Sequence, residues 1–161
     1  MKNTFTQKKG FMMVEVLVAV SIITAAILSG MAVSEKAVQI SRQAFHAEQA
    51  AFLAEEAAEA VRILRDNDWE NISLLETDTD YFPVFSGGTW TLSETPDSVG
   101  IFTRKVSVED VMRDAVTGDI DSSGAADEGG KLVTVSVSWQ EGGTLVTKNL
   151  QFYIFDIFSS T

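Results

Sequence analysis

The stretch Gly10-Phe11-Met12-Met13-Val14-Glu15 places a carboxylate near the start of a long apolar segment. The 23 residues from Phe11 to Val33 include no charged residue other than Glu15. A helix that crosses a bilayer needs about 20 apolar residues, so this segment has the length of a transmembrane helix. An acid inside such a helix costs roughly 2.5–3.5 kcal/mol on insertion scales. Because the segment contains no Lys, Arg or His, we expect the partner of Glu15 to come from another molecule or from a chain terminus created by cleavage.

The residues around this acid form a recognisable pattern. Lys8, Lys9 and Gly10 precede Phe11, and Glu15 follows Phe11 by four positions. A basic leader, a glycine, an apolar residue, this glutamate and an unbroken apolar run together resemble the processing site of type IV pilins and pseudopilins. The resemblance covers about the first 35 residues. It implies that prepilin peptidase cleaves after Gly10 and methylates the new terminus at Phe11, and that Glu15 pairs with the terminal amine of a neighbouring subunit.

The resemblance also implies a function and a set of partners. The chain would be a structural subunit of a type IV pilus or a type II secretion-like filament. Its partners would be prepilin peptidase, other pilin or pseudopilin subunits and an inner-membrane assembly platform. Many major pilins have a proline near the position of Ala32 and a C-terminal disulfide, whereas this chain has no Cys and its first proline is Pro83. These departures favour a minor pilin or a pseudopilin.

Three other interpretations of the same segment stay open. A secretory signal peptide would be cleaved near Gly30-Met31-Ala32, although the apolar run is longer than the usual core and contains Glu15. An uncleaved signal anchor would leave Glu15 without a role in assembly. A membrane-anchored extracytoplasmic binding domain would use the same helix and never polymerise. Cleavage after Gly10 distinguishes a filament subunit from all three.

Composition and charge indicate an exported protein. The chain has 161 residues and a formal net charge of -11, and removal of residues 1–10 takes away three lysines and leaves -14. Basic residues precede the apolar run and acids dominate after it, so the N-terminus is expected in the cytoplasm and the remainder outside. This predicts a single-pass cytoplasmic membrane protein that later enters a cell-surface or periplasmic filament. Direct binding to nucleic acid is not expected, because phosphate contacts need basic clusters.

We divide the chain into a leader (1–10), a transmembrane and assembly helix (11–33) and an extracytoplasmic head (34–161). Apolar residues spaced by three and four continue the helix through 34–66, with its end at Asn67-Asp68. At 1.5 Å per residue, a helix over 11–66 would be on the order of 80 Å long. The apolar stripe beyond the membrane segment consists of Ala37, Ile40, Ala44, Ala47, Ala51, Ala54, Ala58, Val61 and Leu64. We expect its part from Ala51 to Leu64 to cover a sheet, and Phe45, Phe52 and Leu53 to join that core.

After Trp69 the apolar spacing changes to two, which is typical of strands. The predicted strands are Thr89–Ser93, Phe102–Val108, Leu132–Trp139 and Val146–Phe155, and Glu141-Gly142-Gly143-Thr144 is predicted to join the last two as a hairpin. One face is apolar, with Val133, Val135, Val137 and Trp139 on the third strand and Leu150, Phe152 and Ile154 on the fourth. The predicted fold class is therefore α+β: a long N-terminal helix packed on an antiparallel meander of about four strands within residues 80–156.

An acidic loop is the second candidate site. Asp119, Asp121 and Ser123 place oxygen atoms at alternate positions, a glycine follows, and Asp127 comes three residues later. This spacing resembles the start of an EF-hand loop, so calcium is a candidate ligand. The twelfth position, however, is Gly130 where that motif has a bidentate glutamate. The alternative is a solvated loop rich in Asp, Ser and Gly.

No catalytic constellation is found in the sequence. His46 is the only histidine, there is no Cys, and neither a phosphate-binding nor a dinucleotide-binding glycine motif occurs. We therefore expect a protein that is not an enzyme, with His46 as an ordinary residue on the helix surface.

Overall fold

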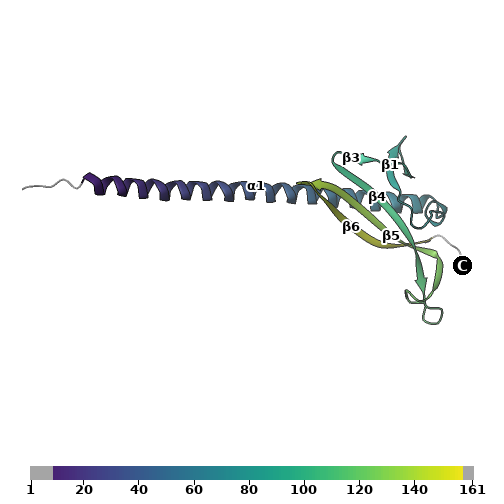
Figure 1. The fold of residues 1–161 in the computed structure, drawn as a ribbon. Coiled ribbons are helices and arrows are strands. Elements are labelled where there is room, and N and C mark those ends of the chain that lie inside the picture. The colour runs from purple at the N-terminus through teal and green to yellow at the C-terminus, as the bar shows by residue number, and fades with distance from the viewer. Residues whose placement is uncertain (1–8, 158–161) are drawn as a thin grey trace, which may run out of the picture. The chain divides into compact units, whose positions relative to one another are not determined.

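The computed structural model describes residues 9–157, and its first element is the 59-residue helix α1 (Lys9–Asn67), shown in Figure 1. The helix predicted over 11–66 is confirmed. The chain forms two compact units, Met1–Ala44 and Phe45–Thr161, and α1 contributes residues to both.

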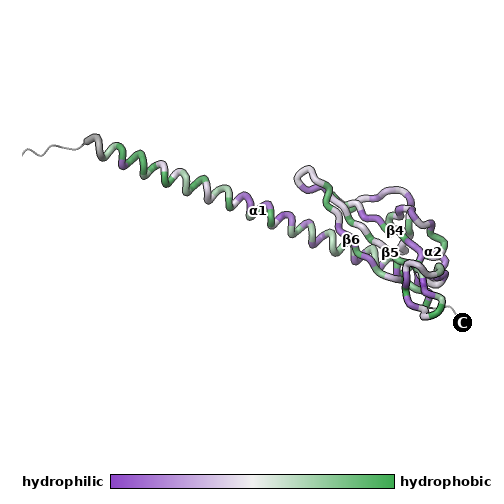
Figure 2. The backbone as a smooth tube through the Cα atoms, turned by 60° about the horizontal axis from the view of Figure 1, so that its bottom comes forward, coloured by the Kyte–Doolittle hydropathy of each residue, from purple (hydrophilic) through white to green (hydrophobic). Residues whose placement is uncertain are grey.

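In the first unit, α1 leaves its apolar side chains uncovered. Every side chain from Met12 to Ile40 is exposed, and the hydropathy colouring of Figure 2 is strongly apolar over the early part of the helix. The hydroxyls of Ser21, Thr24 and Ser29 each donate to the carbonyl four residues earlier, at 2.7–2.8 Å. These three hydroxyl groups are thereby satisfied within the helix, as an apolar environment requires. This part of α1 is long and apolar enough to cross a membrane, which is compatible with a single-pass anchor.

In the second unit, α1 ends where the chain turns into the short helix α2 (Glu70–Ser73). The backbone N–H of Asp68 and the side-chain amide of Asn71 both donate to the Leu64 carbonyl, at 3.1 and 3.0 Å. These bonds satisfy a carbonyl that the end of the helix would otherwise leave open. Ile72 of α2 is fully buried in the core, so the turn fixes α2 against the sheet.

The main sheet is an antiparallel meander with the strand order β3-β4-β5-β6. Its strands are β3 (Ser98–Val99), β4 (Phe102–Arg113), β5 (Ala125–Glu141) and β6 (Thr144–Phe155). The predicted hairpin is confirmed: Glu141 pairs with Thr144, and Gly142 and Gly143 between them have φ of 57° and 85°. Such a two-residue turn favours glycine because both positions lie in the left-handed region. The α+β fold class predicted from the sequence is confirmed.

One predicted strand belongs to a different sheet. Thr89–Ser93 is β2, and it pairs with β1 (Phe82–Ser86) in a separate two-stranded hairpin. The sequence analysis did not identify β1, because its second residue is Pro83 and proline within an apolar run argues against a strand. Arg104 of β4 holds this hairpin: it donates to the Pro83 carbonyl at 3.3 Å and lies 5.6 Å from the centre of the Trp90 ring.

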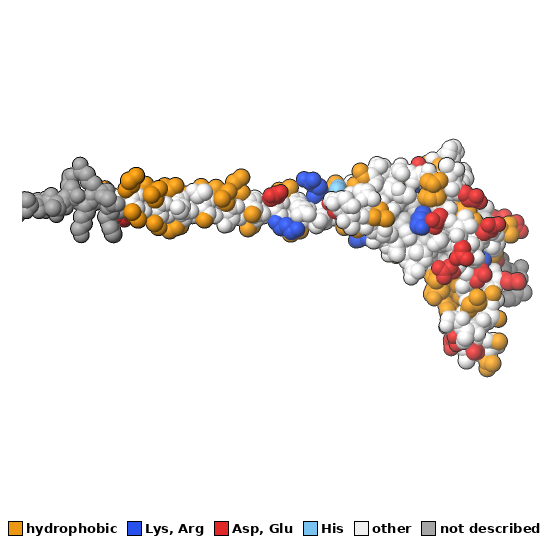
Figure 3. Space-filling view, in the orientation of Figure 1, with side chains coloured by type: hydrophobic (Ala, Val, Ile, Leu, Met, Phe, Trp, Pro, Cys, Tyr) orange, Lys and Arg blue, Asp and Glu red, His pale blue; other side chains and the backbone are white. Residues whose placement is uncertain are grey.

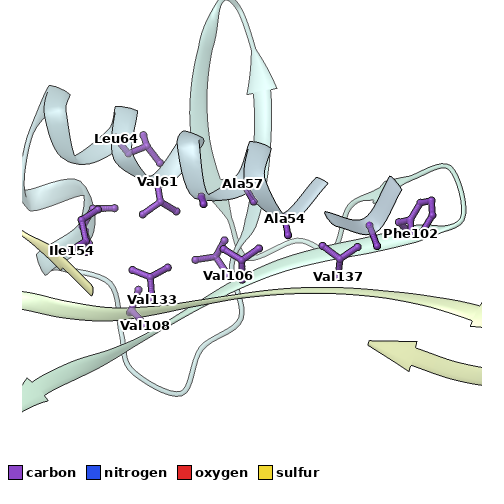
Figure 4. Packing of buried hydrophobic residues seen from close by; sticks show 14 of the residues in the cluster. Ala54, Ala57, Val61, Leu64, Phe102, Val106, Val108, Val133, Val137 and Ile154 are labelled. Atoms are coloured by element: carbon purple, nitrogen blue, oxygen red, sulfur yellow. The ribbon is translucent and has the colours of Figure 1, made fainter. Parts of the chain in front are cut away.

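The core lies between α1 and the inner face of the sheet (Figure 4). Val133, Val135, Val137 and Trp139 are between 0% and 4% exposed, which confirms the predicted face of β5. The helix contributes small residues to this core: Ala54, Ala57 and Val61 are buried in the same cluster as these valines. Their short side chains allow the helix backbone to approach the sheet closely, and each fully buried valine contributes roughly 1.5–3 kcal/mol of transfer free energy.

Two residues predicted for this core are outside it. Phe45 and Phe52 are 57% and 62% exposed, whereas Leu53 packs partly buried against the core as predicted. The buried face of α1 instead follows Ala50, Ala54 and Ala57. Phe45 and Phe52 are seven residues apart, so they share a different face of the helix, about 20° from each other at 100° per residue.

Candidate functional site

The first candidate site is Glu15 and the apolar helix around it. A shallow surface groove of about 450 Å³ on α1 is lined by Val14, Glu15, Val18, Ala19 and Ile22. All of these side chains are exposed, and no ion pair to Glu15 is found in the described part of the chain. The surface offers apolar contacts on every side and one carboxylate. Chemically, it suits a second apolar helix that brings a positive charge near Glu15.

The predicted cleavage position lies next to this groove. Gly10 and Phe11 belong to the first turn of α1, and the side chain of Phe11 lies outside the described part of the chain, as does most of the predicted leader. Along the helix, Phe11 and Glu15 are four residues apart. Positions separated by four lie on the same helix face, one turn apart.

In the acidic loop, which is the predicted calcium site, the structure shows an ion pair within the chain. Asp127 binds Arg113 at 2.5 Å and accepts the Gly129 N–H at 3.0 Å. The hydrogen bond from Arg113 is the main cause that holds the pKa of the Asp127 carboxyl below its ordinary value. Asp127 is therefore already neutralised by a cation from its own chain. The proposed binding of calcium by Asp119, Asp121, Ser123 and Asp127 stays a prediction.

Asp119, Asp121 and Ser123, the other residues of that set, also take part in hydrogen bonds within the loop. Asp121 accepts the backbone N–H and the hydroxyl of Ser123, both at 2.9 Å, and these bonds lower the pKa of the Asp121 carboxyl. The backbone N–H of Asp119 donates to the Thr117 hydroxyl at 3.3 Å. Within residues 9–157, no group of three or more acidic or histidine side chains is placed to hold a metal ion. In the loop, Asp114 and Asp121 close turns through their own hydrogen bonds.

Asp114 is a structural residue of this loop that the sequence analysis did not identify. Its Oδ1 accepts the N–H groups of Val116 and Thr117, each at 2.7 Å, and these bonds lower the pKa of the Asp114 carboxyl. Arg113 Nη1 also donates to the Gly118 carbonyl at 2.9 Å. An Asp that starts a turn by binding N–H groups two and three residues later is a common signal. It was available in the sequence Asp114-Ala115-Val116-Thr117-Gly118.

His46 is not the ordinary surface residue that the sequence suggested. Its Nδ1 lies 2.8 Å from Glu141 Oε2, and the side chains are 20% and 15% exposed. The same Glu141 oxygen accepts the indole N–H of Trp139 at 3.0 Å. A carboxylate acceptor at Nδ1 means that this nitrogen carries the proton. The contact joins α1 to the end of β5, and only the tertiary structure brings these residues, 95 positions apart, together.

A second groove, of about 510 Å³, lies beside His46 in the second unit. Residues of α1 form one wall, and the turn between β3 and β4 forms the other. The lining consists of His46, Gln49, Phe52, Leu53, Val99, Gly100, Ile101 and Phe102. No Asp, Glu, Lys or Arg lines it, although acidic side chains gather over the head (Figure 3).

The structure thus presents two apolar surfaces, one around Glu15 and one beside Phe52, and an acidic loop held by its own hydrogen bonds. No family model, no curated protein and no solved structure matches the chain.

Proposed function

We propose that this chain is a structural subunit, a minor pilin or pseudopilin, of a type IV pilus or a type II secretion-like filament. The observation that carries the proposal is Glu15: one carboxylate without a described partner, on a helix whose apolar side chains are all exposed from Met12 to Val33. The N-terminal pattern of Lys8-Lys9-Gly10-Phe11 supports it through its resemblance to the prepilin processing site.

The proposed action is mechanical and has two states. Before assembly, the apolar residues of α1 face lipid, and Glu15 raises the free energy of membrane insertion because it is an acid in an apolar environment. After assembly, the same residues face the helices of other subunits, and Glu15 lies beside the methylated amine of a neighbouring Phe11. Two unit charges 4 Å apart attract by about 4 kcal/mol at an effective dielectric constant of 20. This is comparable to the insertion cost of roughly 2.5–3.5 kcal/mol, so pairing offsets it.

In the proposed filament the amine comes from a neighbour. Phe11 and Glu15 of one chain lie one turn apart on the same helix face. A neighbour displaced along the helix axis can bring its terminus level with Glu15. Alignment by this contact would fix the stagger between subunits, because apolar packing alone is non-directional.

Mass spectrometry of the mature protein from its native membrane tests the proposal. The expected mass corresponds to a chain that begins at a methylated Phe11. A mature chain that begins at Met1 indicates an anchored protein that never polymerises, and one that begins at Val33 indicates a cleaved signal peptide. Either result overturns the proposed function.

A further inference from the structure

Two basic side chains of α1 have no acidic partner among the described residues of their own chain. Lys36 and Arg42 are exposed, and neither takes part in any ion pair of the described part of the chain. Lys36 Nζ donates to the side-chain oxygen of Gln39 at 3.0 Å, and this acceptor is a neutral amide. Figure 3 shows basic side chains on α1 beyond its apolar part. The positive charges of this segment are therefore accessible to another molecule.

In the second unit, by contrast, nearly every basic side chain is paired. Residues 45–161 contain seven Lys and Arg, and six of them form an ion pair with a carboxylate of the same unit. The seventh is Lys148 of β6, which is exposed and has no ion pair among the described residues. Pairing within the unit is thus the usual state of a cation in this chain, and Lys36 and Arg42 differ from it.

Formal charge is distributed unevenly along the chain. Residues 34–44 contain Lys36, Arg42 and a single acid, Glu35, which gives a net charge of +1. Residues 45–161 contain 21 Asp and Glu against 7 Lys and Arg, which gives a net charge of -14. Two second units therefore repel each other, whereas the second unit of one copy attracts the segment 34–44 of another. Charge favours a contact between these unlike surfaces over a contact between two second units.

Anionic lipid is the other source of negative charge near this segment. The apolar run ends at Val33, and the headgroup region of a bilayer extends roughly 5–8 Å beyond the hydrocarbon core. At 1.5 Å per residue, Arg42 lies about 14 Å along the helix from Val33. For a helix that stands along the bilayer normal, this distance exceeds the depth of the headgroups. Lipid phosphate can therefore reach Lys36, whereas a protein carboxylate can reach both side chains.

We infer that Lys36 and Arg42 of one copy form ion pairs with the acidic second unit of another copy of this chain. Because the two contact surfaces differ, each copy offers its cations to one neighbour and its acids to another, and such a contact repeats along a row. The ion pairs also compensate part of the repulsion between second units. The inference rests on the proposed filament and adds a contact outside the membrane to the one at Glu15.

Zero-length crosslinking of the assembled full-length protein tests the contact. A carbodiimide joins a lysine amine to a carboxylate only where the two groups touch. We expect a product with the mass of two chains, in which mass spectrometry finds the peptide that contains Lys36 joined to a peptide from residues 45–161. Lys36→Arg keeps the charge and removes the reactive amine. This control should assemble within twofold of the unmodified chain and give at least tenfold less of the product.

A charge test is independent of the crosslink. Arg42→Gln and Lys148→Gln each remove one exposed cation that has no ion pair among the described residues, so both change the net charge equally. Arg42→Gln should lower the fraction of processed protein in sheared filaments about threefold or more, since a single exposed pair contributes modestly. Lys148→Gln should leave this fraction unchanged within experimental error. Equal effects of the two substitutions would contradict the contact.

Three results of the crosslinking would overturn the inference. They are the absence of a two-chain product that depends on Lys36, a product in which Lys36 is joined to a protein of another mass, and a crosslink of Lys36 found only within single chains. If instead Arg42→Gln releases the unassembled chain from anionic membranes and Lys36 gives no two-chain product, lipid phosphate and not a second copy is the partner.

The two proposals fail in different ways. If the mature chain begins at Phe11 and assembles but no two-chain product forms through Lys36, only the ion-pair contact is wrong. If the product forms in a chain that keeps residues 1–10, the contact holds and the pilin-like function is wrong.

Discussion

At the residue scale, several acidic side chains of the head form ion pairs with basic side chains of the same chain. Arg113 neutralises Asp127, Lys131 binds Asp110 at 2.6 Å, and Lys105 binds Asp80 at 2.8 Å. Within the described part of the head, most basic side chains are used in this way. The surplus acids therefore remain on the surface and give the head its negative charge.

The Arg113–Asp127 pair makes the stability of the head depend on pH. The pKa of Asp127 is lower in the folded chain than its ordinary value. Its contribution is therefore fully present above about pH 4 and is lost as pH falls through the folded value. Asp127→Asn should lower the urea midpoint of unfolding at pH 7, and this difference should shrink as pH falls below about 4 and through the lowered pKa of Asp127. Glu128→Gln, at an exposed neighbour, should show no such pH-dependent difference. A constant difference across this range would contradict the assignment.

Val135 tests the assignment of the strand faces. It is completely buried, so Val135→Asp would place a charge without a partner in the core. An uncompensated buried charge costs about 3–5 kcal/mol, a large part of the stability of a small domain. The full-length variant in detergent should lose the cooperative unfolding of its head, measured by circular dichroism during heating. Ser136→Asp, on the opposite face of β5, is the matched control and should melt close to the unmodified chain.

At the scale of elements, the ends of β4 and β5 are fixed by close backbone contact. The two strands pair from Thr103–Ser138 to Arg113–Ala125, with a register shift between Asp110 and Val111. A Cβ atom on Gly124 would overlap the backbone of Arg113. Gly124, which precedes β5, therefore permits the last pairing before the loop. A Cβ atom on Gly130 of β5 would meet the side chain of Phe155.

Substitution at Gly124 should open this end of the sheet. Gly124→Ala forces the backbones of β4 and β5 apart, so hydrogen exchange at Met112 and Arg113 should become at least tenfold faster. Gly129→Ala is the control, because its Cβ would meet only a side-chain oxygen of Asp127 at 3.4 Å, without a positive φ. Equal exchange rates in the two variants would show that the overlap with Arg113 does not control the pairing.

The acidic loop also gives a prediction about metal. Asp127 is bound to Arg113, and Asp121 is bound to Ser123, so the carboxylates are not arranged as a set of ligands. A ligand at a hundredfold excess over its Kd would stabilise the folded state by about 2.7 kcal/mol. We expect no such effect: the melting temperature should be the same with millimolar calcium and with chelator. A rise that Asp119→Asn combined with Asp121→Asn removes would support the calcium site predicted from the sequence.

At the scale of the whole molecule, the chain combines an uncovered apolar helix with an acidic head. From Met12 to Ile40 the first unit exposes its apolar side chains, whereas the second unit buries a core of valines and alanines. A soluble domain rarely exposes such a large apolar surface, and this surface is compatible with a single-pass membrane anchor.

Glu15 links membrane insertion to assembly in the proposed function. Glu15→Ala should insert normally, because the substitution removes an insertion cost. It should reduce filament incorporation at least tenfold, because the neighbouring amine then has no partner. Glu15→Leu should behave in the same way, since charge and not volume is lost. The measurement is the fraction of processed protein in sheared filaments, and normal incorporation of either variant would contradict the pairing.

Local periodicity was enough to predict most elements of this protein. The spacing of three and four from Ala37 to Leu64 predicted α1, and the alternation from Leu132 to Trp139 predicted β5 and its buried face. These features depend on neighbours along the chain, because a helix places residues three or four apart on one face and a strand alternates its faces. The turn at Gly142-Gly143 is equally local.

Only the tertiary structure determined which apolar side chains are exposed to solvent and which charged side chains form pairs. Phe45 and Phe52 have the composition of core residues, but the sheet covers the alanine face of α1, so they are exposed. The contacts of His46 with Glu141 and of Arg113 with Asp127 join residues 95 and 14 positions apart. Sequence spacing carries no signal for such pairs, because their distance depends on how helix and sheet pack. The sequence by itself determined the apolar helix with its single acid and the strands with their faces; packing determined the groove, the ion pairs and the use of the acidic loop.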